Sequence, residues 1–340
     1  MKLADYNYEL PKAKIAQQPP KKRGDAKMLV LDRHNGEIKD RKYSDVLDFL
    51  HPGDVVVLNN TKVIKARLIG LGSDGKEHEI LLTEKHGHED EKFHHKVMYR
   101  GNLVEGMELN VGGVNLKVIG IYDDGTALLE STTDFMELAE KYGHVPLPPY
   151  MKRQDTAEDR LRYQTEFANK AGSVAAPTAS LNMTEDLIEK IKAKGVKVCY
   201  ITLHVGLGTF MPIRVDDIKK HKMHSEWFSV PAETARLICV AKQQSNKIIA
   251  VGTTVARTLE YASETILNNK PINGEADIFI YPGYEFSLID MLLTNFHAPK
   301  STVLMLAAAF AGWDYLHRAY THALKENYRF LSYGDSMLIT

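Results

Sequence analysis

The sequence predicts a mixed α/β protein in which an all-β, barrel-like domain is inserted into a discontinuous α/β domain. Two observations lead to this prediction. Residues 61–147 hold short segments of strand-like alternation separated by Gly, Asp and Asn, whereas helix and strand patterns alternate from residue 159 onward. Because the chain before residue 60 also has α/β character, we expect residues 1–60 and 148–340 to form one domain around the insert.

The first expected element is a buried strand at residues 53–58, an apolar run that ends in the polar cluster 59–62. Short alternating segments then predict the strands of the insert at residues 63–69, 79–83, 95–99, 107–111, 114–121 and 127–130. Such regular spacing without helices is typical of a small antiparallel barrel or sandwich. A helix at residues 134–142 and the stiff proline run at 146–150 lead back to the first domain.

The rest of the chain predicts helices and strands in alternation. An amphipathic helix is expected at residues 185–194, with Thr184 as its N-cap. The same reasoning predicts further helices at residues 232–244, 255–267, 302–311 and 315–326, and strands at residues 196–203, 247–251 and 276–280. This order is typical of an α/β layer.

The composition limits the class of protein. A hydrophobic content of 44% with 26% charged residues fits an ordinary soluble protein. Cys199 and Cys239 are too few for a disulfide scaffold or a structural zinc site, so we expect a reducing, cytoplasmic location. The longest apolar run, residues 303–313, is shorter than the roughly 20 residues that cross a bilayer, and we expect no contact with membranes.

The charge pattern leaves two interpretations of the N-terminus. A formal net charge of -1 argues against indiscriminate binding to polyanions, yet it permits a local basic face. Lys21, Lys22 and Arg23 lie in such a basic stretch within the first 30 residues. From charge alone, a solvated edge is the simpler interpretation, and a contact with nucleic acid is the alternative.

The most informative stretch follows the strand expected at residues 196–203. His204 stands at the end of that strand. Gly206 and Gly208 let the backbone approach a ligand closely, and Thr209 supplies a hydroxyl. The pattern is not the dinucleotide-binding fingerprint, which needs a third glycine and a following helix. A functional loop and a tight turn beside a core histidine both stay open.

A second polar segment lies where the strand at residues 247–251 gives way to a helix. The N–H groups and hydroxyls of Thr253 and Thr254 form a natural cradle for an anion or a ribose. Arg257, one turn further, points at the same ligand in this interpretation. A simple helix cap is the alternative.

Two more segments combine polar and small residues. Asn295, His297 and Lys300 precede the helix expected at residues 302–311, and they are too many polar groups for a connection without a role. Ser173 and Thr178 lie in a stretch of small residues where a flat ligand could rest on exposed backbone. Close packing of the chain is the alternative for that last stretch.

The histidines also suggest a metal site, which the sequence does not support well. His221, His224 and Glu226 invite this interpretation because histidines three residues apart can share a helical face, but a third clear ligand and an HExxH arrangement are missing. The second histidine group lies in an acidic, loop-rich part of the insert and is expected to be solvated: His78, His86, His88, His94 and His95. We therefore expect no bound metal.

Many separate blocks, in one order and nearly end to end, resemble the S-adenosylmethionine:tRNA ribosyltransferase-isomerase family of queuosine synthesis. The blocks are Leu10-Pro with Ile15-Ala-Gln, Val57-Leu-Asn-Asn-Thr-Lys-Val with Ala66-Arg-Leu, Pro146-Leu-Pro-Pro-Tyr, Gly172-Ser-Val-Ala-Ala-Pro-Thr-Ala, Thr202-Leu-His-Val-Gly-Leu-Gly-Thr-Phe, Met223-His-Ser-Glu, Val251-Gly-Thr-Thr, Tyr281-Pro-Gly-Tyr, Asn295-Phe-His with Pro299-Lys-Ser, and Tyr328-Arg-Phe with Ser332-Tyr-Gly-Asp. So many blocks together are far more specific than any one motif.

The resemblance implies a reaction and its partners. The ribosyl part of S-adenosylmethionine is transferred and isomerised onto the 7-aminomethyl-7-deazaguanine at the wobble position of a tRNA. Epoxyqueuosine forms, and adenine and methionine leave. The resemblance further implies a cytoplasmic monomer with an α/β domain and a β-barrel domain, no permanently bound cofactor, and S-adenosylmethionine as the ribosyl donor.

Candidate residues follow from this resemblance and from proton chemistry near neutral pH. The candidates for proton transfer are His204, His224 paired with Glu226, and His297. The candidates for substrate binding are Asn59, Thr61, Arg67, Ser173, Thr178, Gly206, Gly208, Thr209, Thr253, Thr254, Arg257, Asn295 and Lys300. The candidates for contact with nucleic acid are Lys21, Lys22 and Arg23.

This chain departs from the family pattern in three places. Asn182 stands where the family has a histidine, Met211 where arginine is common, and Ala298 where leucine is usual. If the missing imidazole carries a proton, Asn182 cannot replace it. The alternatives are therefore a catalytically weakened tRNA- or nucleotide-binding relative and, less favoured, a metal-dependent hydrolase.

Overall fold

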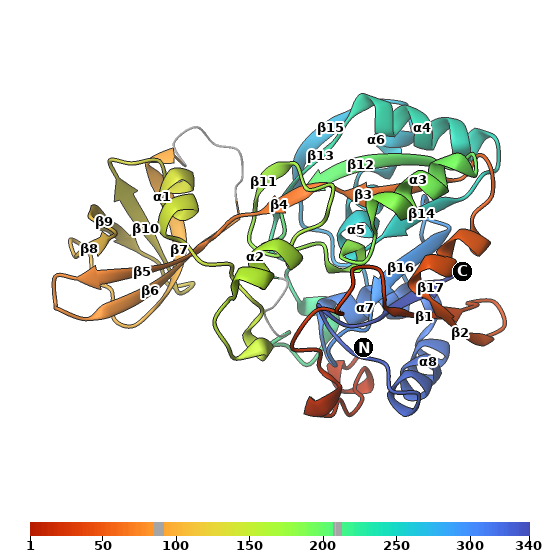
Figure 1. The fold of residues 1–340 in the computed structure, drawn as a ribbon, viewed down its shortest axis with the longest axis horizontal. Coiled ribbons are helices and arrows are strands. Elements are labelled where there is room, and N and C mark those ends of the chain that lie inside the picture. Colours follow the sequence, from red (N-terminus) through yellow and green to blue (C-terminus); the bar gives the residue numbers. More distant parts are fainter. Residues whose placement is uncertain (85–91, 207, 209–212) are drawn as a thin grey trace.

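The computed structural model describes residues 1–84, 92–206, 208 and 213–340. It combines a large mixed sheet flanked by helices with a separate closed β-barrel (Figure 1). In Figure 1 the barrel lies on the left, in orange and yellow, while both ends of the chain lie with the large sheet. The predicted class, a mixed α/β protein with an all-β barrel, is confirmed.

In the described residues, nine strands form the large sheet in the order β15-β13-β12-β3-β14-β16-β17-β1-β2. The strands are β1 (Lys27–Leu31), β2 (Ile38–Lys42), β3 (Val55–Asn59), β12 (Lys197–Leu203), β13 (Glu226–Val230), β14 (Ile248–Val251), β15 (Ile272–Ala276), β16 (Met291–Asn295) and β17 (Ser336–Ile339). The central strands β12, β3, β14 and β16 are parallel neighbours. The edge strand β2 is exposed along most of its length.

Helices cover both faces of this sheet, so its central strands are apolar on both sides. Val55 and Val57 of β3 pack on one face with the helices α4 to α8, and Val56 and Leu58 pack on the other face with α3. The helices are α3 (Glu185–Ala193), α4 (Ala232–Gln243), α5 (Thr253–Tyr261), α6 (Ser263–Leu267), α7 (Thr302–Ala311) and α8 (Trp313–Lys325). Short 3-10 turns occur at Leu3–Asp5, Lys12–Lys14, Tyr43–Phe49, Pro149–Met151, Thr178–Ser180 and Ile218–Lys220.

The barrel closes through antiparallel pairing in the order β10-β7-β6-β5-β8-β9. Its strands are β5 (Arg67–Gly72), β6 (Glu77–Leu82), β7 (His94–Arg100), β8 (Glu108–Val111), β9 (Val114–Ile121) and β10 (Thr126–Ser131). Alternate side chains such as Leu68, Ile80 and Val97 fill the interior. Helix α1 (Phe135–Tyr142) packs against this core and begins at Asp134, whose carboxylate accepts the N–H of Met136 at 2.7 Å.

Two segments connect the barrel to the large sheet. Strand β4 (Thr61–Val63) pairs in parallel with β11 (Lys170–Ser173), outside both sheets. The return segment carries the proline run and helix α2 (Ala157–Arg162). The expected domain limits at residues 61 and 147 stay a prediction.

Most expected elements are found, with differences that have physical reasons. The strand expected at residues 276–280 is wrong: β15 ends at Ala276, and Ile278 and Phe279 pack beyond it against the helical core. The helix expected at residues 255–267 is divided into α5 and α6 at Ala262. No helix of the described residues is both long enough and apolar enough to span a membrane.

Candidate functional site

Four polar positions meet at one edge of the large sheet. Strands β12, β3, β14 and β16 run in parallel, so their carboxyl ends lie at the same edge. His204 follows β12, Asn59 ends β3, Thr253 follows β14 and Asn295 ends β16. Ligands of open α/β sheets bind at such an edge.

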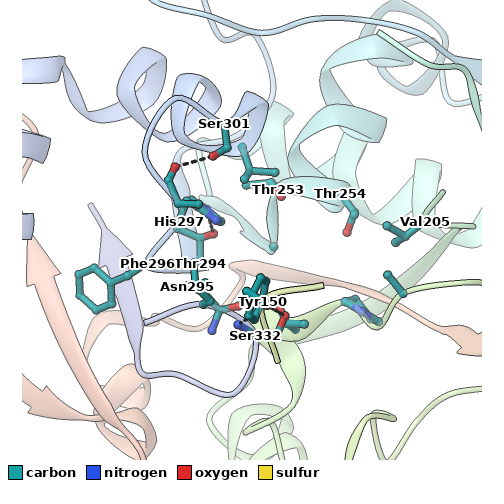
Figure 2. A pocket seen from close by; sticks show the side chains of 18 of the residues that line it. Tyr150, Val205, Thr253, Thr254, Thr294, Asn295, Phe296, His297, Ser301 and Ser332 are labelled. Atoms are coloured by element: carbon teal, nitrogen blue, oxygen red, sulfur yellow. Dashed lines mark hydrogen bonds between the residues drawn. The ribbon is translucent and has the colours of Figure 1, made fainter. Parts of the chain in front are cut away.

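A cavity of about 530 Å³ opens there, a volume within the range of small-molecule sites. Six of the predicted binding and catalytic residues line it: Thr178, Thr253, Thr254, Asn295, His297 and Lys300. Much of the remaining lining is apolar and includes Ala175, Ala176, Pro177 and Phe296. Figure 2 shows Thr253 and Thr254 across from Tyr150 and Ser332, with His297 and Asn295 beside them.

One side of the cavity is the N-terminus of α5. Gly252, with φ at 98°, turns the chain from β14 into this helix, and only glycine adopts that conformation readily. Within the described residues, no side chain caps α5. The first N–H groups of the helix are therefore open to an anion or a hydroxyl, and the helix dipole favours negative charge there.

A second helix, α7, also begins at the cavity. The Ser301 hydroxyl accepts the Leu304 N–H at 3.2 Å and donates to the Ala298 carbonyl at 2.7 Å. Lys300, just before it, has a left-handed φ of 57°, and its side chain is exposed. Two helix N-termini and one ammonium group thus give this cavity a positive potential.

Asn295 is held in place by two partners. The Thr178 hydroxyl donates to the Asn295 carboxamide oxygen at 2.7 Å, and the Asn295 amide donates to the Asp335 carbonyl at 3.3 Å. Both Thr178 and Asn295 line the cavity. This arrangement fixes a polar pair that can bind the hydroxyls of a ligand.

His297 is a neutral group in this site. Burial lowers its pKa to about 3, so the imidazole carries no charge near neutral pH. Nε2 lies 2.9 Å from the Thr294 hydroxyl, and the backbone N–H donates to the Tyr320 hydroxyl at 2.9 Å. The Tyr8 hydroxyl donates to the His297 carbonyl. These contacts position the ring on the cavity wall.

His204 lies behind the wall rather than on it. Nδ1 is 2.8 Å from the Thr61 hydroxyl, and the ring stacks on Trp227 with centroids 5.1 Å apart. A Cβ atom at Gly172 would lie only 2.7 Å from Nε2, so that glycine is required for the close approach. Val205, the next residue, does line the cavity.

The Asn59 side chain connects the segment around His204 to α5. Its amide donates to the Leu203 carbonyl at 3.0 Å and to the Thr254 hydroxyl at 3.4 Å. Its oxygen accepts the N–H groups of Thr61 and Leu203, each at 3.1 Å. The side chain therefore ties three neighbouring segments together next to the cavity.

Glu226 and Arg257 form a buried ion pair at 2.6 Å, with side chains only 3% and 8% exposed. The other Glu226 oxygen accepts the Gly206 N–H at 2.7 Å, and Arg257 also donates to the Ala276 carbonyl at 3.2 Å. The expected pairing of Glu226 with His224 is not found in the described residues. His224 is exposed and lies against Gly208, because the chain turns outward before β13 begins at Glu226.

Two other candidates have structural partners, and a third lies outside the described residues. The Ser173 hydroxyl accepts the Val205 N–H at 2.9 Å and donates to the Ala175 carbonyl at 2.7 Å. Arg67 lies on the barrel, 2.9 Å from Glu79, and does not line this cavity. Thr209 lies outside the described residues, as do Met211, His86 and His88.

The basic N-terminal candidates differ from one another. Lys21 and Lys22 are exposed. Arg23 is half-buried and donates to the carbonyls of Gln164 and Leu181 at 2.9 and 2.8 Å, and burial lowers its pKa. Arg23 therefore binds its own chain in this structure.

No metal site forms around His221, His224 and Glu226 in the part of the chain that the structure describes. The His221 ring contacts Phe279, and Glu226 is paired with Arg257. Asn182 is buried and its oxygen accepts the Gly24 N–H at 3.4 Å. Asn182 is not part of the cavity lining.

Some site residues were not foreseen. Tyr150 and Ser332 line the cavity and are hydrogen-bonded to each other, and burial raises the pKa of Tyr150 to about 12. Both stand in blocks that carry the family resemblance, which was the available signal. Glu84, which lies beyond the end of β6, is against Gly206, and no spacing in the sequence indicated that contact.

Comparison with known proteins agrees with this geometry. The model of the family described as "Queuosine biosynthesis protein" matches residues 3–339. The S-adenosylmethionine:tRNA ribosyltransferase-isomerases of Pelodictyon phaeoclathratiforme and Chlorobaculum parvum are 51% and 52% identical, with full coverage of both chains. A crystal structure of S-adenosylmethionine tRNA ribosyltransferase from Thermotoga maritima is 34% identical with a TM-score of 0.57, and it covers 99% of this chain and 100% of that one. This chain therefore belongs to the queuosine biosynthesis protein family.

Proposed function

We propose that this chain is an S-adenosylmethionine:tRNA ribosyltransferase-isomerase. It would transfer and isomerise the ribosyl part of S-adenosylmethionine onto the aminomethyl group of a 7-deazaguanine in tRNA, with release of adenine and methionine. The observation that carries this proposal is the cavity where six of the expected residues meet at the carboxyl ends of parallel strands. Full-length similarity to relatives of that name supports it.

The cavity offers a partner for each part of the donor. The open N-terminus of α5 and Lys300 suit the methionine carboxylate, which is the anionic part. Thr178, Thr254 and Asn295 suit the ribose hydroxyls. The small residues 175–177 leave a flat apolar surface for the adenine ring.

The reaction depends on proton transfer more than on activation of the sulfonium leaving group. Methionine leaves as a neutral thioether when the amine attacks the activated ribosyl carbon, whereas loss of adenine and closure of the epoxide require proton movement. His297 is neutral and lines the cavity, so we assign it a hydrogen bond to the donor. His204 and His224 do not line the cavity, so their part in proton transfer stays a prediction from the sequence. Glu226 becomes a positioning residue because it holds Arg257 and the Gly206 N–H.

Release of adenine tests the proposal directly. The protein is mixed with S-adenosylmethionine and a tRNA that carries the aminomethyl-deazaguanine, and adenine and methionine are measured by liquid chromatography. We expect both in amounts equal to the modified tRNA. The same tRNA with an ordinary guanine at the wobble position is the control and should release none. Binding of both substrates without any adenine would contradict the proposal and favour a non-catalytic relative.

The location and assembly of the protein are part of the same proposal. The family resemblance supports a cytoplasmic monomer, without a resident cofactor. Light scattering on the purified protein should give a mass near the 38.3 kDa of one chain. A mass of twice that value would contradict this part alone.

A further inference from the structure

A second cavity, of about 570 Å³, lies between the barrel and the returning chain. One wall is the outer face of strands β5, β6 and β7, and the other is the segment at residues 146–154. The proposed reaction gives this cavity no role. Its volume is as large as that of the first cavity, and its lining is more polar.

The floor of the second cavity follows from the barrel register. Arg67 pairs with Leu81, and Leu81 pairs with Met98, so these three side chains form one row across three strands. The row faces outward because the neighbouring Leu68, Ile80 and Val97 fill the barrel interior. Prolines of the run at residues 146–149 form the opposite wall. A flat ring can therefore lie between two apolar surfaces.

The rim of this cavity is basic. Arg67, Arg100, Lys152 and Arg153 line it, against the single carboxylate of Glu79. Arg67 is 2.9 Å from Glu79, while Arg153 binds Asp159 through two nitrogens at 2.5 and 2.8 Å. Arg100 is 3.8 Å from Glu79 and its side chain is 78% exposed, and Lys152 is also exposed. The excess of positive charge complements phosphate groups.

The second cavity adjoins the first. Pro149 lines both cavities, so the second begins where the first ends. A strand of RNA whose reactive nucleotide reaches the donor in the first cavity would place its neighbour at the second.

We propose that the second cavity binds an unpaired nucleotide of the RNA substrate, adjacent in sequence to the nucleotide that reacts. Its base lies on Leu81 and Met98 against the proline run, and its phosphate lies beside Arg100 and Lys152. Proteins recognise single-stranded RNA by this combination of flat contacts for the base and cations for the backbone. The inference rests on the proposed function, because it needs a tRNA that reaches the donor in the first cavity.

Exposed cations allow a test that leaves the fold intact. Arg100→Ala, Lys152→Ala and the double variant are compared with Lys117→Ala, an exposed lysine on β9, the strand opposite β6 in the barrel ring. We expect each variant of the cavity to raise the KM for tRNA by about fivefold and the double variant by about 20-fold, with a weaker salt dependence. The KM for S-adenosylmethionine should change by less than about twofold, because the donor site is separate. Lys117→Ala should match the wild type in both constants.

The outcomes separate this inference from the proposed function. If the wild-type protein releases no adenine, the proposed function fails whatever the variants do. If the wild type is active and the double variant keeps the wild-type KM for tRNA, the nucleotide site fails while the function stands. A rise in both KM values would also overturn the inference, since it would indicate a general distortion of the protein.

Discussion

Replacing Glu226 with leucine should destabilise the protein by about 3–5 kcal/mol, because the Arg257 guanidinium would stay buried without its counter-charge. Leucine resembles glutamate in volume, so the change removes charge and hydrogen bonding with little change in packing. The Gly206 N–H would also lose its acceptor. Since the total stability of a protein is about 5–15 kcal/mol, this single change would remove a large part of it.

A cycle of variants assigns this loss to the ion pair. Arg257→Met should be similarly destabilising, because it leaves the Glu226 carboxylate buried without the guanidinium. The double variant Glu226→Leu with Arg257→Met removes both charges and should be more stable than either single variant by at least about 2 kcal/mol. Glu226→Gln keeps an oxygen for the Gly206 N–H and should cost less than Glu226→Leu.

Urea unfolding followed by tryptophan fluorescence is a suitable assay, because Trp227 stands directly beside Glu226. The control is Glu189→Ala, which breaks the exposed pair with Lys192 and should cost less than about 0.5 kcal/mol. The reasoning is refuted if Glu226→Leu costs less than about 1 kcal/mol, or if the double variant loses the sum of the two single losses.

Three other changes test the site. Thr178→Val removes the hydroxyl that binds Asn295 and should raise the KM for S-adenosylmethionine by about fivefold to tenfold. The control, Thr321→Val on the exposed face of α8, should leave this KM unchanged. Equal KM values for the two variants would contradict the role of Thr178. Gly172→Ala places a Cβ atom 2.7 Å from the His204 ring and should lower kcat at least about tenfold. Gly283→Ala is the control, because Gly283 also has a positive φ but has open space around it. A loss of kcat in the first variant alone comes from the contact with His204 and not from backbone strain. For His297, the pKa of about 3 lies below the ordinary 6.5, so its contribution to stability is complete above pH 6.5 and is lost as the pH falls toward 3. Between pH 6.5 and pH 5 the unfolding free energy of the wild type should therefore fall by about 2 kcal/mol more than that of His297→Gln. If the two proteins have the same pH profile, His297 is not buried in its neutral form.

The sequence predicts an element well where a local pattern decides its structure. The helix expected at residue 185 begins there, with the Thr184 hydroxyl accepting the Leu187 N–H at 3.2 Å. The strands of the barrel alternate because one of their faces is buried and the other is exposed. Strands β16 and β17 were not expected, because they are short and buried on both faces and therefore lack alternation.

Contacts between distant residues are harder to foresee. Thr253 and Asn295 were expected in one site because polar residues precede a helix at both positions and both stand in blocks of the family resemblance. The parallel pairing of β14 with β16 brings the two positions together. The pair of Glu226 and Arg257 depends on which face of β13 points inward, and the sequence of that strand does not reveal it. Arg67 was expected among the substrate-binding residues, yet the chain leaves the large sheet after β3, and Arg67 lies on the barrel, away from the first cavity.

The strand β2 at one border of the large sheet has a consequence for solubility. Its backbone N–H and C=O groups on the open side could pair with a strand of another molecule, the first step of many aggregates. Lys39, Asp40, Arg41 and Lys42 fill four of its five positions and are exposed, so a second strand would have to bring its backbone against a row of hydrated charges. This border therefore discourages association through strand pairing, whereas the closed barrel has no such border to protect.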